Sequence, residues 1–465
     1  MEDIVKRKKG KSLAQFCKDA SSRIKKLEVD EFEIYAASST HNELELFNSQ
    51  IDNLSFAETQ GLGIRIFKDK RVGYSYTSIL DEYNIEKCID RAFSNSKITF
   101  QEEFNYLPLE SELKSSKGII DKKILFSEDF FNFDIKQKIQ LAKKLEILAK
   151  KKDKRVTGIN NLIYDDSLDE VMILNSTGFF DSYRTTSAFI YLSVISKEKD
   201  DTSTGDFFGY DRSPGEFNLE EIAANAVNRS VSILGGKKIK SQVVDIVLDP
   251  FIAAQFLGII AGIVTADTVQ KGKSLLKDRI GDKIFKGDFD IIDDGTLSYG
   301  LASKPFDGEG VPKGKTVIFE NGILKTYLYN TYTARKDKKF STGNAVRASY
   351  KSTPEVGVSN FYLKPSKTSL EKIIKSVDKG FYIIDIIGLH SGINPISGQI
   401  SVGAKGLWID KGSFSKPVKE VTIATDLLSF CKSIDKIGDD LRFMPSGGYI
   451  GSPSILVKDI AISGK

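Results

Sequence analysis

The sequence predicts an α+β protein. We expect an N-terminal mixed domain, in which helices flank an antiparallel sheet, and a β-rich C-terminal domain with a few helices. Apolar residues at helical spacing and alternating apolar residues typical of strands follow one another in the first half, while short strands and turns dominate from about residue 290. A chain of 465 residues is too long for one ordinary core, so we place two domains at 1–236 and 237–465.

The first half begins with a helix predicted over 12–28, where apolar residues recur at steps of three and four. Alternating segments then predict an antiparallel meander of separate strands, and a turn is expected at 38–42. The polar stretch 197–206 has no periodicity and is interpreted as a surface loop. The other predicted elements are helices around 85–93, 135–148 and 218–234, and strands over 156–195 with a turn at 175–178.

The domain junction is placed after Gly235-Gly236, where glycine suits the end of a helix. The second half opens with a strand over 243–248 and a helix after Asp249-Pro250, because Asp can cap a helix and Pro suits its first turn. A tight hairpin is predicted at Asn321-Gly322, the pair that most readily takes two positive φ values. One helix, over about 370–378, is expected within this β-rich half.

Composition excludes several classes of function. The 67 Lys and Arg residues against 63 Asp and Glu leave a net charge of +4, and the basic residues are spread along the chain, so no nucleic-acid partner is expected. No apolar run is long enough to span a membrane, and the charged start does not resemble a signal peptide, so we expect a cytoplasmic protein. The cysteines, Cys17, Cys88 and Cys431, form no C-x-x-C pair and are interpreted as buried apolar residues.

The chain has only two histidines, His41 and His390, and they lie in different halves. A metalloprotease helix needs two imidazoles about one turn apart with a glutamate between them, so the chain cannot build a histidine-ligated catalytic zinc site. His41 is interpreted as a surface residue of the expected turn. His390 lies in the small-residue loop 388–392, where backbone could approach a ligand, although a structural role is the alternative.

Other catalytic patterns are missing or ambiguous. The sequence has no G-x-S-x-G elbow and no complete phosphate-binding or dinucleotide-binding motif. The carboxylates Asp293, Asp294, Asp307 and Glu309 could hold a hard cation or act as acid and base. Their neighbouring glycines favour the other interpretation, in which they stabilise tight turns.

Three segments of the chain together carry a family resemblance. They are Phe306-Asp307-Gly308-Glu309-Gly310 with the hairpin that follows it, Ser341-Thr342-Gly343-Asn344-Ala345-Val346-Arg347, and Gly392 to Ile409 with its N-P-x-S/T-G…S-x-G-A-x-G-x-W pattern. Their order and spacing resemble the TldD/PmbA family, also known as modulators of DNA gyrase, and point to its PmbA (TldE) branch, and the likeness covers nearly the whole chain. Candidate residues for substrate or interface contact are Asp307, Glu309, Gly343, Asn344, Arg347, His390 and Asn394.

The resemblance implies where a zinc motif is missing. The TldD branch is described as a zinc metalloprotease with an HExxxH helix and a later cysteine ligand. The flanking pattern places that helical motif at Leu257 to Gly262, so Leu257, Gly258 and Gly262 stand where the ligands and the glutamate would be. The region of the later cysteine, 444–449, has no thiol. No cofactor is therefore expected in this chain, and zinc is expected in a TldD-like partner.

The leading hypothesis is a non-catalytic subunit that pairs with a TldD-like chain in a complex that cleaves unfolded peptides, antitoxins or peptide precursors. An alternative is a stand-alone homodimeric peptide-binding protein without protease activity. A third is a hydrolase that uses the carboxylates at 293–309. Tyrosines that are candidates for peptide or subunit contact, with ordinary sheet packing as the alternative, are Tyr210, Tyr327, Tyr329 and Tyr332.

Overall fold

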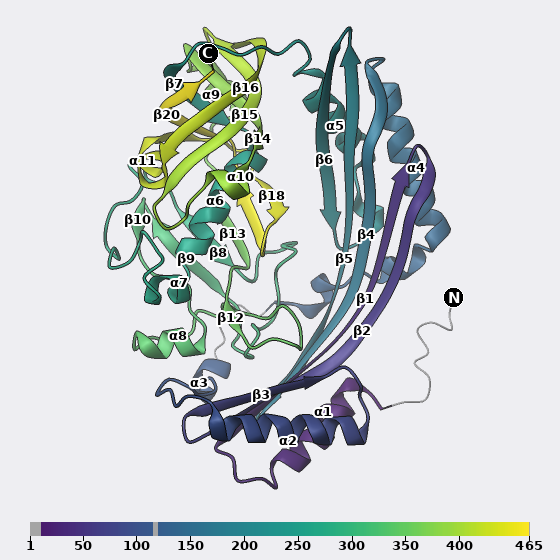
Figure 1. Ribbon diagram of the computed structural model, residues 1–465, viewed down its shortest axis with the longest axis vertical. Helices are drawn as coiled ribbons and strands as arrows, with labels where there is room; N and C mark the ends of the chain where they lie inside the picture. Colours follow the sequence, from purple (N-terminus) through teal and green to yellow (C-terminus); the bar gives the residue numbers. More distant parts are fainter. Residues whose placement is uncertain (1–10, 115–119, 465) are drawn as a thin grey trace.

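A long antiparallel sheet forms one side of the molecule, and the computed structural model describes residues 11–114 and 120–464 (Figure 1). Its strand order is β3-β2-β1-β4-β5-β6. The strands are β1 (Glu31–Phe47), β2 (Gln50–Lys68), β3 (Arg71–Thr77), β4 (Val156–Asn175), β5 (Phe180–Glu198) and β6 (Asp201–Asp211). Helices and antiparallel sheets together confirm the predicted α+β class.

Helices cover the outer face of this sheet in two groups. Apolar side chains at alternate positions of the strands point to this face, and they pack against α1 and α2 at one end and against α4 and α5 at the other. The opposite, inner face packs through Tyr35 and Tyr183 onto Phe306 and Tyr350 of the C-terminal half. The helices of this half are α1 (Leu13–Ile24), α2 (Glu82–Ile98), α3 (Glu110–Leu113), α4 (Ile135–Lys152) and α5 (Leu219–Val231).

The C-terminal half contains two larger sheets. In one, the order is β16-β15-β14-β7-β20-β17, and β16 also pairs with β20, so the sheet closes on itself. Its strands are β7 (Gln242–Leu248), β14 (Lys379–Ile387), β15 (Gln399–Asp410), β16 (Ser413–Asp426), β17 (Ile434–Ile437) and β20 (Ile455–Ser463).

The second larger sheet has the order β10-β9-β8-β13-β19-β18, and β11 and β12 form a separate pair. These strands are β8 (Ile291–Asp294), β9 (Lys315–Glu320), β10 (Ile323–Leu324), β11 (Ala345–Val346), β12 (Glu355–Val356), β13 (Asn360–Leu363), β18 (Arg442–Pro445) and β19 (Tyr449–Ser452). The helices are α6 (Pro250–Ile263), α7 (Ala266–Gln270), α8 (Thr331–Lys336), α9 (Leu370–Lys375), α10 (Leu389–Gly392) and α11 (Leu427–Ser433).

Helix α6 is a central element of the C-terminal core. Asp249 caps it by accepting from the N–H of Phe251, and Pro250 occupies the first turn, as the sequence predicts. The Phe256 ring stacks on Phe430 of α11 with 4.8 Å between the centroids. Although α6 is strongly apolar, no helix among the described residues is long and apolar enough to cross a membrane.

Several predicted elements are confirmed and two local interpretations are wrong. The opening helix, the helix after Asp249 and the hairpin are present, and Asn321 and Gly322 take φ values of 50° and 77°. His41 is not in a turn, because β1 continues through 38–42 as one strand. The polar stretch 197–206 is not a loop either, because β5 and β6 extend from both sides to a tight turn at Lys199.

Candidate functional site

Two cavities lie between the inner face of the long sheet and the C-terminal half. The first, of about 300 Å³, is lined by Asp307, Arg347 and Tyr210 among others, and we call it the Asp307 cavity. The second, of about 280 Å³, is lined by Gln255, Phe208 and Arg229 among others, and we call it the Gln255 cavity. The segment 444–449 contributes to both, because residues 444 and 445 line the second and 447–449 line the first.

Residues 257–262, where the resemblance places the zinc motif of the TldD branch, lie on α6 beside the segment 444–449. Leu257 is buried in the core, whereas a Cβ added at Gly262 would meet nothing within 4 Å. A Cβ at Gly258 would meet only the Oγ of Ser446, at 3.9 Å. The two places that the resemblance identifies with metal ligands are therefore neighbours in space, and α6 packs against both β18 and β19.

No metal-binding side chain is present at either place. Residues 250–263 and 442–452 contain no His, Cys, Asp or Glu. The thiol of Cys431, which follows the Phe430 that stacks on α6, is also unsuited to metal binding, because burial raises its pKa to about 12 and keeps it protonated. The donor set at α6 therefore does not fit a zinc ion.

Asp307 is buried and fully bonded. Its Oδ1 accepts from the backbone N–H of Glu309 at 2.8 Å and of Val311 at 3.0 Å, and its Oδ2 accepts from the N–H of Ala345 at 3.0 Å. Burial and then the Glu309 carboxylate raise the pKa of Asp307 to about 7, while Lys313 acts in the opposite direction. Asp307 therefore fixes the 307–311 loop to β11 and borders the Asp307 cavity.

Glu309 belongs to a buried charge network that joins the two halves of the chain. Its Oε1 accepts from Arg65 at 3.2 and 3.3 Å, and its Oε2 accepts from the N–H of Thr331 at 2.9 Å. Arg65 also makes a two-point contact with Glu33, at 2.8 and 3.0 Å, and Arg347 pairs with Glu33 from the C-terminal half. We call Glu33, Arg65, Glu309 and Arg347 the charge network.

The network holds its charges in a desolvated place. Burial opposes ionisation of Glu33, but Arg347 and Arg65 outweigh it and hold the pKa of Glu33 below its usual value. Arg347 also donates from Nε to the carbonyl of Gly308 at 2.8 Å, and its guanidinium lies 4.7 Å from the centre of the Tyr35 ring. Arg347 thus contacts Tyr35 from the N-terminal half and Gly308 from the C-terminal half, and all three residues line the Asp307 cavity.

Gly343 and Asn344 lie beside a buried lysine and aspartate. The Nζ of Lys313 donates to the Gly343 carbonyl at 3.1 Å and to the Ser359 Oγ at 2.6 Å. The Asn344 amide donates to Asp293 Oδ2 at 2.7 Å. Burial lowers the pKa of Lys313 and raises that of Asp293, so these groups share a poorly solvated position. Gly343 has a φ of 75°, and an added Cβ would lie 2.8 Å from the Pro312 carbonyl.

The remaining sequence candidates are in other settings. Asn394 accepts from the N–H groups of Ile396 and Ser397 and is not among the described residues that line either cavity, while His390 belongs to α10. Asp294 accepts from the N–H and Oγ1 of Thr296 in a local turn. Tyr327 and Tyr329 are buried in the core, whereas Tyr210 lines the Asp307 cavity with its ring 5.9 Å from Tyr449.

No motif in the sequence points directly to Glu33 and Arg65. The two residues are opposite each other in the β1–β2 register, so their pairing could have been inferred once the strands were aligned. Their burial could not have been inferred, because charged residues at alternate positions of a strand ordinarily indicate a solvated face. The covering elements, from the loop at Glu309 and the segment at Arg347, come from a distant part of the chain.

Comparison with known proteins assigns the family. Three family models of PmbA/TldA metallopeptidase domains match the chain. Domain 1 matches residues 32–96, the central domain matches 128–234, and the C-terminal domain matches 241–464. The chain belongs to the TldD/PmbA family. A PmbA metalloprotease homologue of Buchnera aphidicola is 28% identical, covering 90% of this chain and 89% of its own, and supports the PmbA/TldE branch. An uncharacterised protein of Methanocaldococcus jannaschii is 30% identical, covering 92% and 95%.

Solved structures of the family share the fold. A crystal structure from Thermotoga maritima, named as a candidate modulator of a DNA gyrase, superposes with a TM-score of 0.88 at 28% identity and covers 97% of this chain and 100% of that one. TldE from Thermococcus kodakarensis superposes with a TM-score of 0.83 at 22% identity, again covering 97% and 100%. At that identity, the second likeness supports the fold alone.

Proposed function

We propose that this chain is a PmbA/TldE-like, non-catalytic subunit of a cytoplasmic TldD/TldE metalloprotease complex that acts on peptides. The observation that carries the proposal is that α6 has no His, Cys, Asp or Glu side chain. Leu257, Gly258 and Gly262 leave the helix without a ligand or a general base, although the family fold around it is retained. In such a complex, the catalytic zinc would belong to a TldD-like partner, and this chain would supply part of the substrate-binding wall.

The two cavities support a peptide as the substrate. Their walls combine aromatic rings, such as Tyr210 and Phe208, with backbone at the segment 444–449. β6 ends the long sheet and β18 ends the second C-terminal sheet, so both present a strand edge, and residues of both line the Gln255 cavity. An extended peptide can pair with such an edge through its main chain, with little dependence on its sequence.

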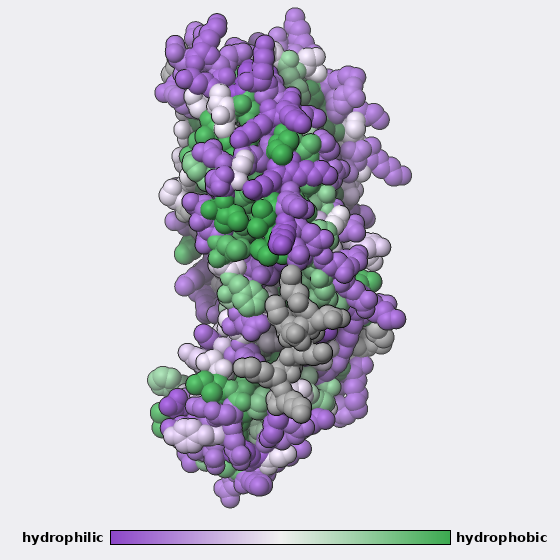
Figure 2. Space-filling model, turned by 90° about the vertical axis from the view of Figure 1, so that its right-hand side faces the viewer, coloured by the Kyte–Doolittle hydropathy of each residue, from purple (hydrophilic) through white to green (hydrophobic). Residues whose placement is uncertain are grey.

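The proposed partner surface is the free part of β2. β3 pairs with β2 only over residues 62–68, so residues 50–61 have a strand neighbour on one side alone. Ile51, Leu54 and Phe56 on this segment are 46%, 50% and 57% exposed. Hydrophobic residues gather among hydrophilic ones on the side of the molecule that carries β2 and α4 (Figure 2). An apolar free edge of this kind is a ready surface for a second chain.

Co-expression with a TldD-like chain tests the proposal. We expect a stable complex by size-exclusion chromatography with light scattering, and peptidase activity that requires both chains. The double substitution Leu54→Lys and Phe56→Lys should weaken the complex at least tenfold, whereas Ile98→Lys, at an 81% exposed position of α2, should leave it unchanged. The proposal fails if no complex forms and the activity of the TldD-like chain is the same without this subunit.

A stand-alone homodimeric peptide-binding protein is the second candidate. The free edge of β2 favours it as well, because an antiparallel edge can pair with its own copy about a two-fold axis. Light scattering of the purified chain separates the two candidates. A dimer that persists when a TldD-like chain is added, without gain of peptidase activity, would favour this one.

A further inference from the structure

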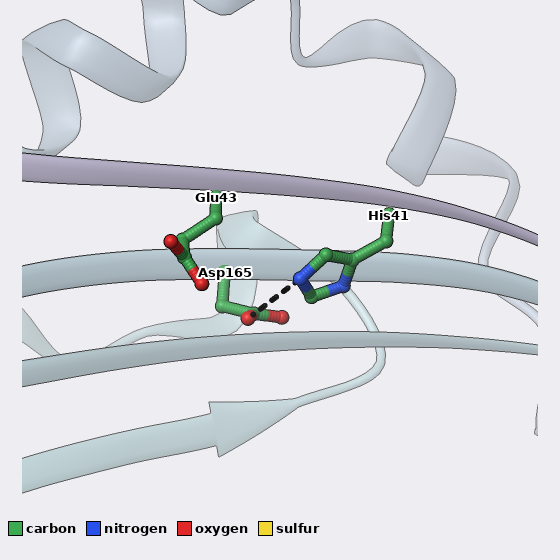
Figure 3. A group of neighbouring side chains, drawn as sticks. All are labelled: His41, Glu43 and Asp165. Carbon is green, nitrogen blue, oxygen red and sulfur yellow. Dashed lines mark ion pairs between the residues drawn. The ribbon is translucent and has the colours of Figure 1, made fainter. Parts of the chain in front are cut away.

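His41 lies on the inner face of the long sheet with two carboxylates beside it. It belongs to β1, as does Glu43, and Glu43 is directly opposite Asp165 of β4. The three side chains project to the same side of the sheet, and the imidazole points toward Asp165 (Figure 3). The Nε2 of His41 is 3.2 Å from Oδ2 of Asp165. One ligand atom from each of the three residues falls within 4.8 Å of the others.

The cluster has excess negative charge and is open to solvent. The His41 imidazole attracts the Asp165 carboxylate when it is protonated, while the carboxylates of Asp166 and Glu43 repel it. Burial, followed by these charges, raises the pKa of Asp165 to about 6. The His41 and Asp165 side chains remain 38% and 30% exposed, so an ion could enter with bound water.

The surrounding strands hold the three side chains in place. Glu43 Oε1 accepts from the Asn53 amide of β2 at 3.1 Å, which orients the carboxylate. Zinc binds imidazole nitrogen and carboxylate oxygen at roughly 2.0–2.2 Å, so small rotations of these side chains would bring all three atoms around one ion. A site on regular strands needs less rearrangement than one on a loop.

We propose that His41, Glu43 and Asp165 form a binding site for a divalent transition-metal ion such as Zn²⁺, with water completing the coordination. Imidazole favours such an ion over Mg²⁺ or Ca²⁺. The site is distinct from α6 and does not depend on the proposed subunit role. Asp165 is opposite Phe189, which is opposite Tyr210, so the ion would lie on the same rung of the sheet as residues that line the two cavities.

Zinc binding to the full-length chain tests the site. After removal of metal with chelator, equilibrium dialysis against Zn²⁺ and elemental analysis should give one ion per chain, and Zn²⁺ should raise the melting temperature. His41→Ala and Asp165→Asn should each weaken binding at least tenfold and remove that rise. Asp181→Asn, an exposed carboxylate on β5, is the matched control and should bind as the parent does.

Two results would overturn the site. One is the absence of stoichiometric Zn²⁺ binding in the parent chain. The other is binding that both His41→Ala and Asp165→Asn retain, with far-ultraviolet circular dichroism confirming that the variants are folded. The second result would also place zinc elsewhere in the chain and argue against the non-catalytic subunit. The first would leave that proposal intact, so the two ideas fail in different ways.

Discussion

Two neighbouring parts of the interior have opposite chemistry. On α6 and the segment 444–449, where the resemblance puts metal ligands, the chain has no His, Cys, Asp or Glu. At the junction of the two halves, the charge network instead buries two carboxylates and two guanidinium groups in mutual contact. The difference teaches that the charges needed to join the halves are separate from those needed for zinc chemistry. A subunit could therefore lose the second set without loss of its fold.

Breaking the charge network should cause the largest change in the free energy of unfolding. Glu33→Ala leaves Arg65 with one carboxylate partner and Arg347 with none in the network, both in a desolvated place. Loss of one member of a buried ion pair costs about 3–5 kcal/mol, and we expect a decrease of that size in the free energy of unfolding. Urea unfolding measures it.

A matched exposed pair serves as the control. Asp181→Ala removes the partner of Lys122, and both side chains of that pair are 43% exposed, so little change is expected. Should Glu33→Ala not fold, the milder Glu33→Gln gives the same comparison. Equal effects at the buried and exposed pairs would contradict the role assigned to the network.

The pH dependence of Asp307 gives a smaller effect in the same region. In the folded state the Asp307 carboxyl has a pKa of about 7 and keeps its proton up to that pH. In the unfolded state its pKa is the usual 3.8, so it loses the proton at lower pH. The folded state therefore binds more protons in this window, and the stability that Asp307 contributes falls as the pH rises. Relative to Asp307→Asn, the parent should lose about 2 kcal/mol between roughly pH 5 and pH 8.

Unfolding of both proteins across this pH range provides the measurement. The asparagine variant does not titrate at this position, so the difference between the two curves isolates Asp307 from other acidic groups. A difference that is flat, or that grows in favour of the parent with rising pH, would show that the hydrogen bonds from Glu309, Val311 and Ala345 keep the carboxylate ionised in the folded state.

Sequence periodicity was sufficient for the fold class and for many elements, because local burial patterns reflect local structure. The start of α6 at Asp249-Pro250 and the hairpin at Asn321-Gly322 depend on local backbone chemistry, and both are confirmed. The turn predicted at His41 is wrong. Ser38 to Asn42 is polar, but a polar segment can still form a strand when the strands on both sides supply its hydrogen bonds.

The candidate site was accessible from the sequence only in part. The carboxylate cluster and the family resemblance made Asp307, Glu309 and Arg347 candidates, but nothing in the sequence pointed to Glu33 and Arg65, which reach them through long-range packing. Pairs that are separated by most of the chain leave no local pattern. The proximity of α6 to the segment 444–449 is likewise a property of the folded chain.

Filling the space at α6 should have the smallest effect, and in the opposite direction. Gly258→Ala places a methyl group in ordinary contact range of Ser446, and Gly262→Ala places one in open space, so neither should clash. Alanine restricts the unfolded chain more than glycine does, and each substitution should raise the free energy of unfolding by about 0.5–1 kcal/mol. Gly73→Ala is the contrasting control, since its Cβ would lie 1.9 Å from the Ala92 carbonyl and must destabilise the protein. Destabilisation by either α6 substitution would mean that another group occupies the space beside this helix, and the interpretation of α6 as an emptied ligand position would then be wrong.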